Sequence, residues 1–332
     1  MAVKIVVYGA GAVGLVLGTR MARAGLDVLF VTRRPEVARL IERDGVRLED
    51  LASDDTWSVS ARASCDLRAV ADEFGEAQVL FCMRRSQVET AAAQLAAVAP
   101  GITAVSFQND VDNEECLSRY FARVIGGVYR QTCTRRALNY AVTMGAGRII
   151  LGSHPEGADS RVEGLASLLR GVGYDVGVSR NISADLWLKL CVNLMSAPNA
   201  LIRREDHDTA AFSGIKVRLL EEAQRVLAAA GIDASSCDGR DRSLEDEIAF
   251  QRAAHERGLG VRRLPLYNQV WASLRDGLPP ESTGYHRRLL DLAARHGLLL
   301  PTNQRVLEIL ERAARDSLGP ESAGAAEFLD GL

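Results

Sequence analysis

The sequence has no long run of charges of one sign, although a quarter of its residues are charged. Its 40 Lys and Arg residues nearly balance its 43 Asp and Glu residues, which leaves a formal net charge of −3 at pH 7. Proteins that follow a nucleic-acid backbone or an anionic membrane surface usually gather basic residues in blocks or patches. The even balance therefore argues against nucleic acid and membrane as partners, and we expect a small-molecule substrate.

Long apolar stretches are also missing near the N-terminus. The first apolar run, Ile5–Val7, is short and is followed at once by glycines. A signal peptide or a spanning helix requires a longer apolar segment, so neither fits. We therefore expect a cytoplasmic protein. No feature of the sequence fixes the oligomeric state, and a homodimer stays open.

The cysteines lack the paired spacing of a disulfide scaffold or a zinc site. There are six of them, with no Cys-x-x-Cys pair and no histidine at metal-ligand spacing: Cys65, Cys82, Cys116, Cys133, Cys191 and Cys237. We interpret them as reduced thiols within the core, and we expect no metal.

Two textures divide the 332 residues, a length that is sufficient for two domains. Residues 1–179 alternate short β-branched runs with helical patterns, which is typical of parallel strands joined by crossover helices. Strands are expected at Val3–Tyr8, Asp27–Val31, Val79–Met83, Thr103–Phe107 and Val124–Tyr129, with added strands at Ala141–Leu151 and Tyr174–Val178. This part is predicted to be an α/β Rossmann domain with a doubly wound parallel sheet.

Residues 180–332 are predicted to form a second domain that is entirely helical. Helical patterns cover Ile182–Leu201, Thr209–Ala230, Leu244–Glu256 and Gly284–His296, and Gly231 and Gly297 are expected C-terminal stops. The last thirteen residues, from Pro320 to Leu332, are rich in glycine and alanine, and we expect a frayed tail there.

A glycine-rich turn follows the first expected strand at once. Its residues are Gly9, Ala10, Gly11, Ala12, Val13 and Gly14. In this pattern Gly9 allows the tight turn, Gly11 lets the backbone approach a pyrophosphate, and Gly14 lets the helix pack against the strand. The pattern opens a helix that leads to a second strand. This context predicts a dinucleotide site with the pyrophosphate on the N-terminus of the helix.

The residues after the second expected strand indicate which dinucleotide is bound. An NAD site usually has an acidic residue there for the ribose hydroxyls, whereas this chain has Arg33 and Arg34. A guanidinium suits a 2′-phosphate, so we expect NADP(H). A second pair, Arg84 and Arg85, follows the expected strand at Val79–Met83, and either arginine has the position to contact the same phosphate.

The first expected helix of the second domain carries two polar residues among apolar ones. Lys189 and Asn193 lie one turn apart on one face, with Asp185 a turn before them and Ala197 a turn after. A lysine among Leu, Trp and Cys side chains either faces a cleft or has a shifted pKa, because an unpartnered buried ammonium is costly. Either property suits a general acid, although a lysine that reaches solvent at the helix edge is the alternative.

Together these segments resemble the ketopantoate (2-dehydropantoate) reductase family over nearly the whole chain. The resemblance implies that Arg33 and Arg84 hold the NADP 2′-phosphate and that Asn109, after Gln108, contacts cofactor and substrate. It also implies catalytic roles for Lys189 and for Glu281, the substrate-facing carboxylate, and a substrate role for Asn193. The expected activity is the NADPH-dependent reduction of 2-dehydropantoate to pantoate, a step of pantothenate biosynthesis, by hydride transfer with a lysine general acid.

The sequence departs from the family mainly at residues expected to contact substrate. Ala197 replaces a second asparagine, Asn268 and Gln269 replace serines, and His286 and Arg287 replace an Asn-Gly pair. Asn199, two residues after Ala197, is a candidate to compensate for the missing asparagine. We therefore include Asn199, Gln269 and His286 among the expected substrate residues. Three alternatives stay open: reduction of a different 2-oxo acid or an imine, a non-catalytic NADP sensor, and an opine-type dehydrogenase.

Overall fold

The computed structural model describes residues 4–75, 77–256 and 268–330. The chain divides into two compact units, Met1–Ser183 and Ala184–Leu332. The predicted domain boundary, after residue 179, lies four residues earlier.

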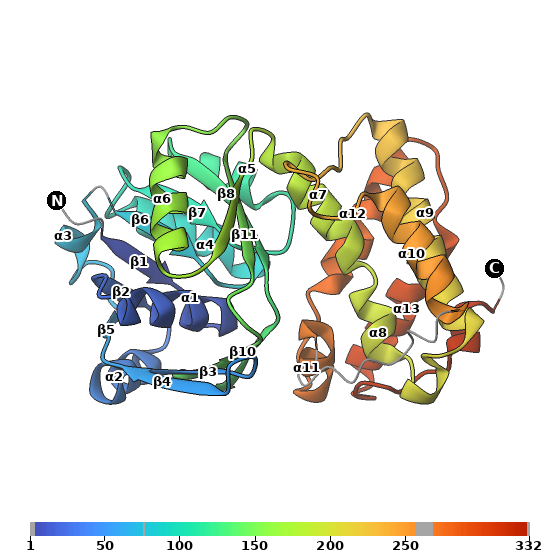
Figure 1. Ribbon diagram of the computed structural model, residues 1–332, viewed down its shortest axis with the longest axis horizontal. Helices are drawn as coiled ribbons and strands as arrows, with labels where there is room; N and C mark the ends of the chain where they lie inside the picture. Colours follow the sequence, from blue (N-terminus) through green and yellow to red (C-terminus); the bar gives the residue numbers. More distant parts are fainter. Residues whose placement is uncertain (1–3, 76, 257–267, 331–332) are drawn as a thin grey trace. The chain divides into compact units, whose positions relative to one another are not determined.

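The first unit is built on a large, mostly parallel sheet (Figure 1). Its strands lie in the order β12-β11-β8-β7-β6-β1-β2-β5. Their bounds are β1 (Ile5–Tyr8), β2 (Val28–Val31), β5 (Arg62–Ser64), β6 (Gln78–Phe81), β7 (Thr103–Ser106), β8 (Val124–Arg130), β11 (Arg148–Ser153) and β12 (Asp175–Val178). Only β11 runs antiparallel to its neighbour β8 among the pairs of this sheet in the described residues. The predicted Rossmann fold is confirmed.

Helices cover both faces of this sheet, which explains why its central strands are apolar throughout. In β1, Ile5 and Val7 enter one hydrophobic core, while Val6 and Tyr8 enter the other. The helices are α1 (Ala12–Arg23), α2 (Pro35–Asp44), α3 (Ala71–Phe74), α4 (Arg85–Ala96), α5 (Asn113–Ser118) and α6 (Ser160–Gly171). A parallel sheet that is buried on both faces has no polar alternation. The five main strands are therefore found within a residue or two of their predicted bounds, although Val3 lies outside the described residues.

A second, smaller sheet was not predicted. Its strands β3 (Val46–Asp50), β4 (Asp55–Val59), β9 (Cys133–Ala137) and β10 (Tyr140–Thr143) lie in the order β4-β3-β10-β9. The segment Ala141–Leu151, which was expected to be a strand broken by glycines, is divided in this way: its first part belongs to β10 and its last part to β11 of the large sheet. The glycines Gly145 and Gly147, both with positive φ, turn the chain between the two sheets.

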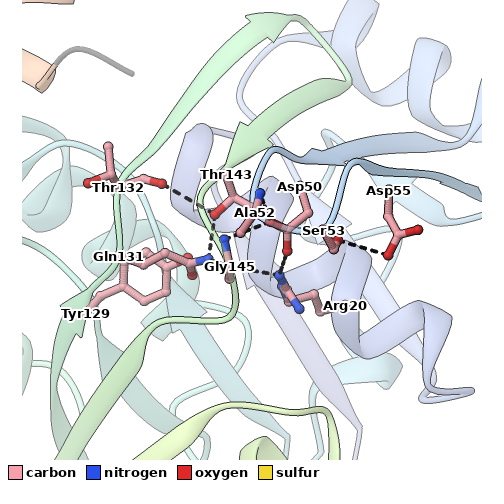
Figure 2. A network of polar contacts seen from close by, with 10 residues as sticks. All are labelled: Arg20, Asp50, Ala52, Ser53, Asp55, Tyr129, Gln131, Thr132, Thr143 and Gly145. Carbon is pink, nitrogen blue, oxygen red and sulfur yellow. Dashed lines mark hydrogen bonds and ion pairs between the residues drawn. The ribbon is translucent and has the colours of Figure 1, made fainter. Parts of the chain in front are cut away.

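Helix α1 lies between the two sheets, and a buried ion pair joins it to the smaller one (Figure 2). Arg20 of α1 contacts Asp50 of β3 at 2.7 Å, with side chains only 10% and 6% exposed. The same Arg20 nitrogen donates to the Gly145 carbonyl oxygen, and Asp50 accepts from the Gly145 and Ala52 amides. Burying two charges is costly, and these additional hydrogen bonds offset part of that cost, although the Arg20 Nε has no partner among the described residues. These bonds therefore fix the helix that begins at the glycine-rich turn.

The second unit contains helices and one isolated bridge, Ile202 with Ala323, among its described residues. Its elements are α7 (Ile182–Asn193), which begins two residues before the unit, α8 (Ser196–Leu201), η1 (Arg204–Asp206), α9 (Ala210–Ala230), α10 (Leu244–Glu256), α11 (Gln269–Arg275), α12 (Ser282–Arg295), α13 (Pro301–Arg315) and η2 (Ala325–Phe328). Gly231 ends α9 in the left-handed conformation, as predicted.

Two expectations for this unit are wrong. The predicted helix Ile182–Leu201 is interrupted after Asn193, where α7 ends and α8 begins at Ser196. The expected frayed tail is packed where it is described, because Ala323 and Phe328 are buried in the helical core and Ala323 pairs with Ile202. Residues 331 and 332 of that tail lie outside the described residues. Within the described part of the chain, no helix is long and apolar enough to cross a membrane.

Candidate functional site

The glycine-rich turn has the geometry that its three glycines predict. Gly9 has φ +111, and a Cβ there would lie 3.0 Å from the backbone at Cys82 and Met83. A Cβ on Gly14 would lie 2.0 Å from the Gly9 carbonyl oxygen, whereas a Cβ on Gly11 would meet only the Cys82 carbonyl oxygen at 3.4 Å. Gly9 and Gly14 are therefore required by the protein's own packing, but Gly11 is not.

This turn lies where a doubly wound sheet binds ligands. The chain leaves β1 for β2 on one side and later returns to β6 on the other side of β1. The carboxyl ends of β1 and β6 thus form the point at which the strand order reverses. Gly11 caps α1, whose first turn has no acidic side chain and no side-chain cap. Its free N–H groups suit an anion such as the pyrophosphate of a dinucleotide.

The arginines next to this turn differ in the partners they have. Arg33 is exposed and makes no ion pair or side-chain hydrogen bond among the described residues, while Arg34 lies 3.5 Å from Glu36. Arg85 forms a bidentate ion pair with Asp112, in which its Nε and Nη2 donate to the two carboxylate oxygens at 2.7 and 2.8 Å. Arg85 is therefore occupied within the protein, while Arg84 is the N-cap residue of α4, at the carboxyl edge of the sheet where the resemblance places a phosphate contact.

Gln108 anchors the segment that follows β7. Its Nε2 donates to the carbonyl oxygens of Phe81 at 2.7 Å and Met83 at 3.2 Å, both at the carboxyl end of β6. Its Oε1 accepts a hydrogen bond from the Ser106 hydroxyl at 2.9 Å. Asn109, the next residue, is half-buried. The predicted contact residue is thus held at the same edge of the sheet as the glycine-rich turn.

Glu114, in the first turn of α5, is a buried carboxyl beside this segment. It is 2% exposed, and neither carboxyl oxygen has a hydrogen bond of normal geometry among the described residues. Burial raises the pKa of Glu114 to about 7, while the Ser106 hydroxyl opposes this shift, and Asp112 and Asp110 add to it. Glu114 therefore changes its charge near neutral pH, unlike an ordinary glutamate.

Helix α7 carries the two polar residues that the sequence singled out. Lys189 and Asn193 are both half-buried, and Asp185, a turn earlier, is 1% exposed and accepts from the Cys237 amide at 2.9 Å. Asn193 is the last residue of the helix, and its carbonyl oxygen accepts from the Ser196 hydroxyl. This bond holds the turn between α7 and α8.

Four residues stand at or near positions where the resemblance implies further substrate contacts, and they differ in burial and in hydrogen bonding. Ala197 is fully buried within the hydrophobic core of the second unit, while Asn199 on α8 is exposed. Asn268 caps α11 by accepting from the Trp271 amide, and its Nδ2 donates to the Ser196 carbonyl oxygen. Its neighbour Gln269 is exposed. The substrate roles of Asn199 and Gln269 stay predictions.

Glu281 caps α12 and is half-buried, whereas His286, on the same helix, is fully buried. The His286 Nδ1 lies 2.8 Å from the Asn303 Oδ1, and the Asn303 Nδ2 donates to Glu222. Since Glu222 can only accept, the Asn303 amide has a fixed orientation, and the His286 Nδ1 must donate. Burial lowers the pKa of His286 to about 4, so its ring is neutral at physiological pH.

Glu222 of α9 holds the N-terminus of α13. Its carboxylate accepts from the amides of Thr302 at 2.8 Å and Asn303 at 2.9 Å, as well as from the Asn303 side chain. It is 4% exposed. A carboxylate at a helix N-terminus is stabilised by the free amides and by the helix dipole.

We expect Glu222→Gln to lower the free energy of unfolding by about 2 to 3 kcal/mol, because a neutral amide turns a donor toward the amides of α13. The neighbouring Glu221 pairs with Arg252 at the surface, so Glu221→Gln should cost less than about 1 kcal/mol. Urea unfolding of both variants measures the difference. Equal losses would show that Glu222 does not hold α13.

Sequence reasoning missed Glu114 and Glu222. Glu114 follows two other acidic residues in an exposed-looking stretch, Asp110 and Asp112, and Glu222 stands beside Glu221 on a long helix. Neither pattern distinguishes a buried carboxyl from a solvated one, because burial here depends on β8 and α13, which are remote in sequence. The spacing of apolar residues along each helix was only a weak indication of which side chains are buried.

The sequence of this chain is similar to those of known reductases. Residues 5–156 match the family described as Ketopantoate reductase PanE/ApbA. The 2-dehydropantoate 2-reductase of Pyrococcus abyssi is 26% identical over 238 residues, which cover 69% of this chain and 75% of the relative. The enzyme of the same name from Shigella flexneri is 25% identical over 324 residues, covering 93% of this chain and 94% of the relative.

Two solved structures share the fold of the whole chain. A PanE/ApbA family ketopantoate reductase from Ralstonia eutropha has a TM-score of 0.77 at 23% identity, covering 95% of this chain and 99% of that one. A D-mandelate dehydrogenase in complex with NADH and anilino(oxo)acetate has a TM-score of 0.79 at 15% identity, with the same coverage.

Proposed function

We propose that this chain is a member of the ketopantoate reductase family, whose model matches residues 5–156, and that it reduces the carbonyl group of a small 2-oxo acid with NADPH. The observation that carries the proposal is the glycine-rich turn, in which Gly11 alone has room for a Cβ and yet is glycine. A glycine that the protein's own packing does not require is explained by a ligand that approaches the backbone.

The described residues fit NADP(H). The free amides at the start of α1 would hold the pyrophosphate, and the exposed Arg33, together with Arg84, would hold the 2′-phosphate. No acidic residue stands at the end of β2, where a ribose hydroxyl of NAD would need one. When bound, the cofactor supplies the hydride. The protein supplies orientation, charge and a proton.

Lys189 is the proposed general acid. An ammonium beside the carbonyl oxygen stabilises the negative charge that develops there and then gives a proton to the oxygen, so that a hydroxyl is formed. Asn193, one turn later on α7, would hold the substrate by hydrogen bonds from its amide. Glu281 would accept a hydrogen bond from a substrate hydroxyl or amine and would favour the charged form of the lysine. Asn109 would orient cofactor and substrate.

The cofactor preference is tested at Arg33. We expect Arg33→Ala to weaken the binding of NADPH by about 10- to 100-fold, because a charge-assisted hydrogen bond to the 2′-phosphate is lost, and to leave NADH binding nearly unchanged. Fluorescence titration with both cofactors measures this. Arg39→Ala, at an exposed arginine of α2, is the control. Equal affinity of the wild-type protein for NADPH and NADH would contradict the assignment.

The substrate class is the finer part of the proposal. The curated relatives named above are 2-dehydropantoate 2-reductases, so 2-dehydropantoate is the first candidate. The buried Ala197 favours a second candidate, a different 2-oxo acid, because an alanine offers no polar contact at a position where the resemblance implies an asparagine. A side chain in the hydrophobic core cannot orient a polar substrate.

A substrate panel separates the two candidates. NADPH oxidation is followed with 2-dehydropantoate, with aliphatic 2-oxo acids of similar size and with phenylglyoxylate, the oxo form of mandelate. A kcat/KM that is highest for 2-dehydropantoate supports pantothenate biosynthesis as the role. A higher value for another 2-oxo acid supports the second candidate. Turnover that requires an added amine would instead indicate an imine substrate.

A further inference from the structure

Arg33 stands in the short segment that joins the end of β2 to the start of α2. Its side chain is exposed, whereas the residue before it, Thr32, is only 5% exposed. The neighbouring Arg34 lies 3.5 Å from Glu36, so Arg33 is the arginine of this segment that has no ion pair among the described residues. A long side chain binds a phosphate more tightly when the backbone that carries it is already held in place.

The backbone before Arg33 is tied to two other parts of the first unit. The Val31 carbonyl oxygen accepts from the amide of Gly9, in the glycine-rich turn, at 2.9 Å. The Thr32 amide donates to the Ser64 carbonyl oxygen, at the end of β5, at 2.9 Å. The end of β2 therefore has a fixed place beside the expected pyrophosphate site.

The Thr32 hydroxyl holds the backbone after Arg33. It donates to the Arg34 carbonyl oxygen at 2.9 Å. The same oxygen accepts from the amides of Val37 at 3.0 Å and Ala38 at 3.3 Å, in the first turn of α2. The hydroxyl thus connects the buried end of β2 to the start of α2. Because this bond spans Arg33, the backbone of that residue has fewer conformations available.

A hydroxyl is not what the end of an apolar strand requires. A valine side chain has nearly the same shape as threonine, is equally β-branched and also suits a buried strand, but it cannot donate a hydrogen bond. Burying a hydroxyl costs free energy unless it is hydrogen-bonded. The bond from Thr32 to Arg34 therefore explains why a threonine stands here.

We propose that Thr32 is a positioning residue for cofactor selection, whose hydroxyl holds the backbone on both sides of Arg33 so that the guanidinium is placed to bind a 2′-phosphate. The inference rests on the proposed function, because it requires that Arg33 binds this phosphate. In this role Thr32 does not touch the cofactor and acts only through Arg33. Its loss therefore affects the binding of NADPH and spares that of NADH, which has no 2′-phosphate.

The test compares the Kd of NADPH and the Kd of NADH in fluorescence titrations. Thr32→Val keeps the shape of the side chain and removes the donor, so it should raise the Kd of NADPH by about 3- to 10-fold, the equivalent of one hydrogen bond. The Kd of NADH should change by less than about 2-fold. Thr32→Ser keeps the hydroxyl and should bind both cofactors nearly as the wild-type protein does.

A double-mutant cycle shows whether the hydroxyl acts through Arg33. In the Arg33→Ala variant, adding Thr32→Val should cause no further loss of NADPH affinity, because the guanidinium that Thr32 positions is absent. Thr19→Val is the matched control, since Thr19 of α1 is 0% exposed and its hydroxyl has no hydrogen-bond partner in the described part of the chain. This control should bind both cofactors as the wild-type protein does. Thermal unfolding shows that all the compared proteins are folded.

Three results would overturn the proposal while the NADPH preference of the wild-type protein stood. They are an unchanged Kd of NADPH in Thr32→Val, equal losses for NADPH and NADH, and the same effect of Thr32→Val with and without Arg33. Equal losses would mean that the hydroxyl has only a structural role. If the wild-type protein bound NADPH no better than NADH, the cofactor assignment of the proposed function would fail, and the role of Thr32 would fail with it.

Discussion

Replacing Lys189 with alanine is expected to lower kcat by about 100-fold or more, while the Kd of NADPH changes little. The reason is that the ammonium acts on the oxygen of the substrate, where charge develops only as the hydride arrives. Loss of such a group removes stabilisation of the transition state and leaves cofactor binding intact. Steady-state kinetics with the best substrate of the panel, together with NADPH titration, separate the two quantities.

Two further variants show which property of Lys189 matters. Lys189→Arg keeps the positive charge but cannot release a proton at neutral pH, so it should restore only the electrostatic part of the lost rate. Lys216→Ala is the control, because the sequence has only three lysines and this one also lies in the helical unit. Burial lowers the pKa of Lys216 to about 8, and its ammonium lies 3.9 Å from the centre of the Phe212 ring.

The Lys216→Ala variant should keep kcat within about 3-fold of wild type, since its lysine packs on an aromatic ring within its own helix. A low lysine pKa alone therefore does not mark the general acid. If Lys189→Ala retained near-normal kcat, Lys189 would have no part in the chemistry, and the lysine mechanism would be wrong.

Two substitutions in the glycine-rich turn are expected to have large but different effects, one on folding stability and the other on NADPH binding. Gly14→Ala places a Cβ 2.0 Å from the Gly9 carbonyl oxygen, so the turn and α1 must move apart. We expect it to lose more than about 3 kcal/mol of unfolding free energy. Gly11→Ala meets only an ordinary contact at 3.4 Å and should fold normally. The added methyl group instead blocks the approach of the pyrophosphate to the backbone.

Gly11→Ala should therefore weaken NADPH binding by about 10- to 100-fold, which corresponds to the loss of a charge-assisted hydrogen bond, and leave the melting temperature nearly unchanged. Gly164→Ala is the matched control, because this exposed glycine of α6 has nothing within 4 Å of a Cβ and alanine favours a helix. Thermal unfolding and NADPH titration of the three variants test the distinction. Full-strength NADPH binding by Gly11→Ala would show that no pyrophosphate lies against this turn.

The sequence predicted the central sheet because its strands are short, apolar and separated by helical patterns of regular length. Buried parallel strands have few alternatives, so Val28–Val31 and Thr103–Ser106 were found almost as expected. The smaller sheet was missed because its strands are partly exposed and three of the four contain charged residues, such as the arginines of β9. Their pairing joins segments that lie far apart in the chain, and no local pattern records it.

The candidate site, like the fold, could be predicted from the sequence only in part. Glycine spacing and the position of Arg33 are local features, so the nucleotide half was predictable. The surroundings of Ala197 and His286 depend on packing between helices. The sequence marked Ala197 as a departure from the family and His286 as an expected substrate contact, without indicating that both are fully buried. Glu114 was missed because a carboxyl in an acidic stretch gives no sign that Gly126 and Ile182 cover it.

The most direct test of the account follows the hydride itself. NADPH carrying deuterium at the transferable position of C4 is incubated with the protein and the preferred 2-oxo acid, and the product is analysed by mass spectrometry and proton NMR. The account predicts a 2-hydroxy acid with deuterium on the former carbonyl carbon, formed faster with NADPH than with NADH. An unlabelled product, transfer from NADH alone, or no reduction of any 2-oxo acid would contradict it.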